Sequence, residues 1–91
     1  FRDAWQRLLL PAIDSFSPDL LLISAGFDGH RADPLAQFQL ETDDFAWVTR
    51  ELAELAGRRC GGRVVSLLEG GYDLSALAQC AAAHVRELEA A

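Results

Sequence analysis

The sequence predicts an α/β fold with parallel strands, because segments with helical and strand patterns alternate along its 91 residues. Two short apolar runs, Leu20–Ser24 and Arg63–Leu68, are the predicted strands. Both runs are continuously apolar rather than alternating, which is typical of parallel strands covered on both faces. Two strands cannot cover each other in this way. We therefore expect the missing strands to come from a longer chain or from other copies of this one.

The first predicted helix spans Arg2–Phe16, with apolar residues at the spacing of one helix face. Pro11 lies inside this helix, where proline removes a hydrogen bond and crowds the preceding turn, so we expect a kink or a restart there. Ser17-Pro18-Asp19 ends the helix before the first strand. A loop from Ala25 to Leu40 follows that strand, and loops of this length are usually functional.

The second predicted helix begins with Thr42 as its N-cap, and Gly57 ends it. After the second strand and a tight loop, Asp73 is the predicted N-cap of a last helix, in which we interpret His84 as a structural residue. The expected buried residues of the second helix are Phe45, Val48, Thr49, Leu52, Leu55 and Ala56, and those of the last helix are Leu74, Leu77, Ala78, Ala81, Val85 and Leu88.

Composition and charge restrict the classes of function. The net charge is −6, without a cluster of basic residues, which argues against nucleic acid or an anionic membrane surface as a partner. No apolar run approaches the ~20 residues of a membrane span. Two cysteines, Cys60 and Cys80, are too few for a disulfide framework, so a reducing cytoplasm is the simplest location. The chain has no methionine and opens within a helical pattern, from which we expect a fragment.

Polar residues flanked by glycine follow both predicted strands. Ligands of open parallel sheets bind beyond the carboxyl ends of the strands, which brings Asp28 and Tyr72 toward one edge. Simpler interpretations stay open: Asp28 precedes Gly29 in a common turn dipeptide, and Tyr72 could pack on Leu77 beside the N-cap. Asp28 and His30 also have the Asp-x-His spacing of a metal pair, although a lone histidine in a polar loop is more often solvated.

Two segments together resemble a known family. Ile23–Leu35 (ISAGFDGHRADPL) is similar to the segment that carries a zinc ligand in class II histone deacetylases and their bacterial relatives. Leu68–Leu74 (LEGGYDL) is similar to the catalytic-tyrosine loop of that family. The resemblance implies the three-layer arginase/deacetylase fold, with residues 1–91 as a single partial domain from the C-terminal part of the deacetylase domain. It covers the chain from about Pro18 onward.

The resemblance also implies roles for individual residues. Asp28 corresponds to the second aspartate of an Asp-His-Asp zinc site, and Tyr72 to the tyrosine that donates a hydrogen bond to the substrate carbonyl and then to the oxyanion. Leu35, Gly70 and Gly71 correspond to residues of the acyl-lysine tunnel. His30 and Glu69 match family positions that are not ligands. The other two zinc ligands and the histidine pair have no counterpart in this sequence, so we expect the isolated chain to be inactive.

The implied activity is zinc-dependent hydrolysis of N-acetyl-lysine. An acetylpolyamine amidohydrolase is the alternative enzyme, and the apolar Leu35 favours acyl-lysine over a polyamine. A different class of function remains open as well. In that hypothesis the chain is a non-catalytic module that associates with copies of itself through its exposed sheet edge.

Overall fold

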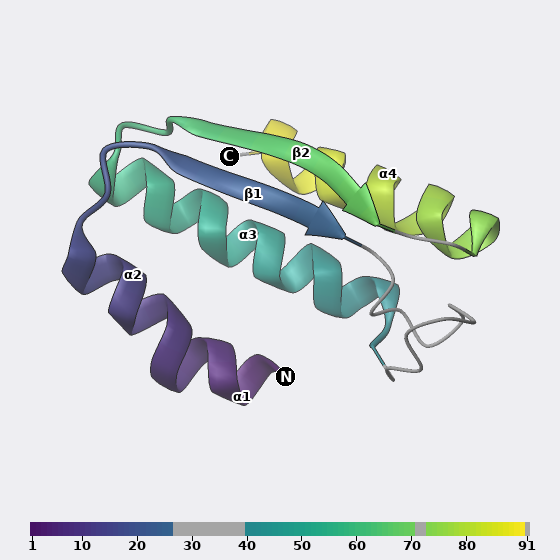
Figure 1. Ribbon diagram of the computed structural model, residues 1–91, viewed down its shortest axis with the longest axis horizontal. Helices are drawn as coiled ribbons and strands as arrows, with labels where there is room; N and C mark the ends of the chain where they lie inside the picture. Colours follow the sequence, from purple (N-terminus) through teal and green to yellow (C-terminus); the bar gives the residue numbers. More distant parts are fainter. Residues whose placement is uncertain (27–39, 71–72, 91) are drawn as a thin grey trace.

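The computed structural model describes residues 1–26, 40–70 and 73–90, and its two strands pair in parallel as predicted. Strand β1 spans Leu21–Gly26 and strand β2 spans Val64–Gly70, so each ends two residues later than predicted. Helix α3 (Thr42–Arg59) connects them, and helix α4 (Leu74–Ala90) follows β2. Both helices lie along one face of the two-stranded sheet (Figure 1). The predicted βαβ arrangement is therefore confirmed.

The N-terminal helical region has three consecutive parts: α1 (Arg2–Ala4), the π-helical segment η1 (Trp5–Leu9) and α2 (Leu10–Phe16). The backbone N–H of Leu10 donates to Trp5 O, a wider turn than in an α-helix. Pro11 follows at the start of α2, where its missing N–H matters least. The expected kink or restart takes the form of a π-helical segment directly before the proline, and the backbone stays helical across it, since Leu9 and Leu10 are both in the right-handed helical region.

The ends of α3 differ from the prediction. Glu41, rather than Thr42, is the N-cap, because the Glu41 backbone N–H donates to the Asp44 carboxylate at 2.9 Å in a capping box. The helix continues past Gly57 to Arg59. Gly61 and Gly62 end it, since both have positive φ (61° and 78°) and the Gly62 N–H donates to Ala56 O. Two glycines in the left-handed region are a stronger stop signal than one helical glycine.

The buried face of α4 was predicted correctly only in part: Leu77 and Ala81 are partly buried against the core, but Leu74 and Val85 are not. Leu74 is 80% exposed and Val85 is 49% exposed. Small residues lie against α3 and the sheet instead; the buried positions of α4 are Ala76, Cys80, Ala83 and His84. Small side chains allow α3 and α4 to approach closely, and so the fully buried positions of this helix are small residues and His84 rather than leucines. The predicted Asp73 cap is confirmed, because Asp73 Oδ1 accepts a hydrogen bond from the Ala76 N–H at 2.8 Å.

The second face of the sheet is uncovered within the described residues. Leu22 is 66% exposed and Leu67 is 59% exposed, although both lie in continuously apolar strands. The opposite face carries the core, which joins Ala25 of β1, Phe45 of α3 and Cys80 of α4. This open face agrees with the expectation that further strands are needed to cover the sheet, because a two-stranded sheet with its helices on one side leaves its other face in water.

Candidate functional site at the carboxyl ends of the strands

The carboxyl ends of β1 and β2 lie side by side. Gly26 and Gly70 are the last paired residues of the two strands. Helices α3 and α4 both begin at this end of the molecule, next to the two arrowheads in Figure 1. Helix N-termini carry partial positive charge and favour anionic groups. This end of the sheet therefore has the polarity expected of a site that handles carboxylates or a developing oxyanion.

The predicted site residues are described only in part. Gly70 closes β2 and is half-buried, beside Gly26 of the neighbouring strand. Asp28, His30, Leu35, Gly71 and Tyr72 lie outside the described residues. Asp28 follows Gly26 by two positions, and Tyr72 follows Gly70 by two positions. The segments that contain them thus start from adjacent points of the sheet.

A hydrogen bond that the sequence did not reveal crosses the two strands near these ends. Ser24 Oγ of β1 donates to Glu69 Oε1 of β2 at 3.3 Å. Both side chains are exposed, on the face of the sheet that the helices leave open. Glu69 is also where the strand pairing becomes irregular, since Ala25 pairs with Leu68 and Gly26 pairs with Gly70. The parallel register, once known, would have placed these two side chains on one face.

The described residues do not form a metal centre by themselves. Within residues 1–26, 40–70 and 73–90, no three His, Cys, Asp or Glu side chains are grouped as ligands. Cys60 and Cys80 are buried free thiols. Burial raises the pKa of the Cys80 thiol above its ordinary value, which favours the protonated form that metals bind poorly. A zinc ion would need ligands outside these ranges.

His84 is held in the interior by two hydroxyl groups. Its Nδ1 lies 2.8 Å from Thr49 Oγ1 of α3, and its Nε2 lies 2.7 Å from Ser66 Oγ of β2. Thr49 Oγ1 donates its only proton to Phe45 O at 2.7 Å, so it accepts from a protonated Nδ1. Burial lowers the pKa of His84, which favours this neutral form. The structural interpretation of His84 is confirmed, because the side chain ties α4 to α3 and β2.

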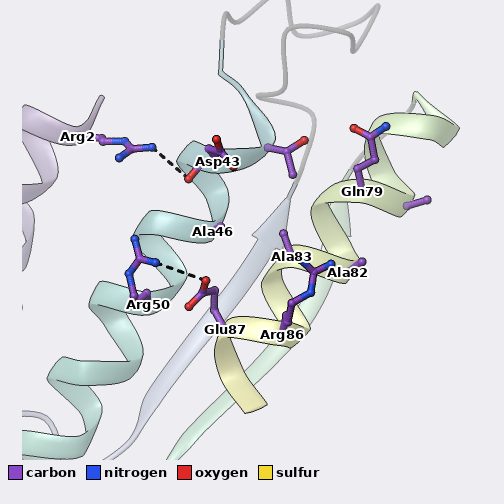
Figure 2. Close-up of a pocket in the computed structure, with 11 residues that line it drawn as sticks. Arg2, Asp43, Ala46, Arg50, Gln79, Ala82, Ala83, Arg86 and Glu87 are labelled. Atoms are coloured by element: carbon purple, nitrogen blue, oxygen red, sulfur yellow. Dashed lines mark hydrogen bonds and ion pairs between the residues drawn. The ribbon is translucent and has the colours of Figure 1, made fainter. Parts of the chain in front are cut away.

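A groove lies on the outer side of α3 and α4, with a volume of about 760 Å³. Its floor is formed by alanines of the two helices, including Ala46 and Ala83, and charged groups surround it (Figure 2). Arg50 Nη1 lies 3.6 Å from Glu87 Oε1 across the groove. Gly70, the predicted site residue that the structure describes, is not among the residues that line it.

None of the helices in the described parts of the chain is long and apolar enough to cross a membrane. This finding agrees with the absence of a 20-residue apolar run in the sequence.

The fold and the position of the glycine-flanked strand ends define an α/β domain with its candidate site at the carboxyl ends of parallel strands. Residues 1–88 match the model of the histone deacetylase domain, so the chain belongs to this family. The resemblance deduced from the sequence is confirmed. Among solved structures, the chain superimposes on a crystal structure of the HDA15 HD domain with a TM-score of 0.83 and 39% identity, covering 93% of this chain and 23% of that one.

Curated relatives include two kinds of deacetylase. The chain is 40% identical over 88 residues to a histone deacetylase-like amidohydrolase of Pseudomonas aeruginosa, covering 97% of this chain and 23% of that protein. It is 45% identical over 85 residues to the polyamine deacetylase HDAC10 of Homo sapiens, covering 93% of this chain and 12% of the relative. The 91 residues thus span less than a quarter of the length of either relative.

Proposed function

We propose that residues 1–91 form the C-terminal part of a zinc-dependent deacetylase domain that hydrolyses N-acetyl-lysine. One observation carries the proposal: the parallel pairing of β1 and β2 brings Gly26 and Gly70 together. Neighbouring strands lie about 4.8 Å apart, so the segments that contain Asp28 and Tyr72 leave the sheet from nearly the same place. A shared origin of this kind is what a metal ligand and an oxyanion donor in one pocket require.

The proposed roles follow the family resemblance. Asp28 is one carboxylate ligand of the zinc ion, and the remaining ligands and a histidine base come from parts of the domain outside this sequence. Zinc polarises an amide carbonyl and acidifies a bound water. The hydroxyl of Tyr72 donates a hydrogen bond to the oxygen on which negative charge develops. Leu35, Gly70 and Gly71 line the channel for the acyl-lysine side chain.

The substrate separates two candidate activities. One relative is named a polyamine deacetylase and another a histone deacetylase-like amidohydrolase. Leu35 gives the proposed channel an apolar residue, which suits the four-carbon stem of lysine and gives no favourable partner to a cationic polyamine. We therefore propose acetyl-lysine as the substrate. From the two free cysteines and the net charge of −6, we also propose a cytoplasmic location and neither nucleic acid nor a membrane as a partner.

The test uses the full-length protein that carries this sequence, assayed with an acetyl-lysine peptide and with N-acetylputrescine. Tyr72→Phe removes one oxyanion donor and should lower kcat by about 10²–10³-fold. Asp28→Asn should lower both activity and zinc content. Asp19→Asn, an exchange of the same type at an exposed site before β1, is the matched control and should change neither. Full activity of Tyr72→Phe, or a preference for N-acetylputrescine, would contradict the respective part of the proposal.

Self-association is the second candidate, and the exposed apolar face of the sheet favours it. Leu22, Val65 and Leu67 are all at least 45% exposed on this face. Exposed apolar patches of this kind promote association. Sedimentation of the 91-residue chain separates the two candidate functions. A compact monomer counts against a self-associating module. If the chain forms an oligomer but the full-length protein does not, the exposed face of the sheet belongs to the interior of the complete domain.

A further inference from the structure

The ladder between β1 and β2 contains one irregularity, and it lies at the candidate site. Pairing is regular from Leu21↔Val64 to Ala25↔Leu68, and the next pair is Gly26↔Gly70. Glu69 is therefore an extra residue on β2, as in a β-bulge. Bulges bend a strand locally and change the direction of the side chains that follow. Tyr72 is three positions after Glu69.

The bulged residue is joined to the neighbouring strand by its side chain. Ser24 Oγ donates to Glu69 Oε1 at 3.3 Å. Beyond this bond, the paired strands end at Gly26 and Gly70, and Gly71 follows. Glycine restrains the backbone less than any other residue. The side-chain bond thus joins the two strands directly before their last ladder pair, Gly26↔Gly70.

We propose that Ser24 and Glu69 are a positioning pair, which fixes the ends of β1 and β2 relative to each other and so the separation of Asp28 from Tyr72. The inference rests on the proposed function, because it assigns the pair a role in that reaction. Neither residue touches the substrate in this role. Glu69 acts only as a hydrogen-bond acceptor, so a neutral side chain with an acceptor oxygen can replace it.

A positioning role predicts an effect on turnover without an effect on stability. Exposed polar pairs of this kind contribute little to the free energy of unfolding. The position of a donor relative to a reacting oxygen is far more sensitive, since an error of about 1 Å can cost about 10²-fold in rate. Loss of the pair should therefore lower kcat while KM and the unfolding midpoint stay nearly constant.

The experiment measures kcat, KM and the urea midpoint of the full-length protein with an acetyl-lysine peptide. We expect Ser24→Ala and Glu69→Ala each to lower kcat by roughly 10–100-fold with KM within about twofold. The double variant should be no worse than either single one. Glu69→Gln keeps an acceptor oxygen and should restore most of the activity. Glu54→Ala, at an exposed position of α3, is the control.

Three kinetic results would each overturn the positioning pair: unchanged kcat in either alanine variant, additive losses in the double variant, or no recovery with Glu69→Gln. A large decrease in the urea midpoint would also overturn it, in favour of a structural role. If the wild-type protein has no deacetylase activity, or if the Tyr72→Phe variant is fully active, the proposed function is refuted and the positioning pair with it. An active wild type with unaffected alanine variants refutes the pair alone.

Discussion

Replacing Thr49 with valine should destabilise the protein by about 1–3 kcal/mol, because it removes a buried hydrogen-bond acceptor. Thr49 is 3% exposed, and its hydroxyl accepts from Nδ1 of His84 at 2.8 Å. Valine has nearly the same shape, so the exchange creates no cavity. The cost comes from the imidazole N–H, which loses the Thr49 oxygen while it remains in the interior, where His84 is 7% exposed.

The assay is urea unfolding of the full-length protein at pH 7.5, followed by tryptophan fluorescence. For an m-value of about 2 kcal/mol/M, the midpoint should fall by roughly 0.5–1.5 M. Thr49→Ser is the matched control, because it keeps the hydroxyl and loses only a methyl group, worth about 0.8 kcal/mol. If Thr49→Val proved as stable as Thr49→Ser or more so, the reasoning about the buried hydroxyl would be refuted.

Two further predictions concern stability. Burial lowers the pKa of His84 below its ordinary value of 6.5, so the unfolded chain binds this proton at a higher pH than the folded one. The contribution of neutral His84 to the free energy of unfolding should be complete above about pH 6.5 and should decrease as the pH falls below that value. Urea midpoints measured between pH 5 and 8 should show this decrease, and the His84→Gln variant should show a smaller one. Gly62→Ala forces alanine to a φ of 78° and should cost about 1–2 kcal/mol. Gly57→Ala should instead stabilise α3 by up to about 1 kcal/mol, since a Cβ there has no atom within 4 Å; equal effects of the two exchanges in thermal unfolding would contradict this account.

Short-range patterns predicted most of the elements. The order of helices and strands, the Asp73 cap and the interruption at Pro11 depend on interactions within one or two turns, and all three are confirmed. The end of α3 was predicted too early. A glycine inside a helix and a glycine that ends one look alike in sequence, and only the positive φ of Gly61 and Gly62 separates them.

The apolar residues alone predicted only part of the buried face of α4, namely Leu77 and Ala81. Leucine and valine are more apolar than alanine, and so a periodicity search selects Leu74 and Val85. The packing of α3 against α4 determines which residues are fully buried. The small buried residues Ala76, Cys80 and Ala83 let α4 approach closely enough for His84 to reach Thr49 and Ser66. Sequence periodicity carries no information about the distance between the two helices.

The candidate site shows the same division between short-range and long-range information. Its two motifs are recognisable in sequence because each is a continuous segment. The link between them, from Ser24 to Glu69, joins residues 45 positions apart and depends on the register of β1 against β2. A one-residue slip would turn one of the two side chains to the opposite face. The exposed leucines of this face also depend on long-range contacts: Leu22 and Leu67 lie in continuously apolar strands, and such strands are typical of sheets that are covered on both faces.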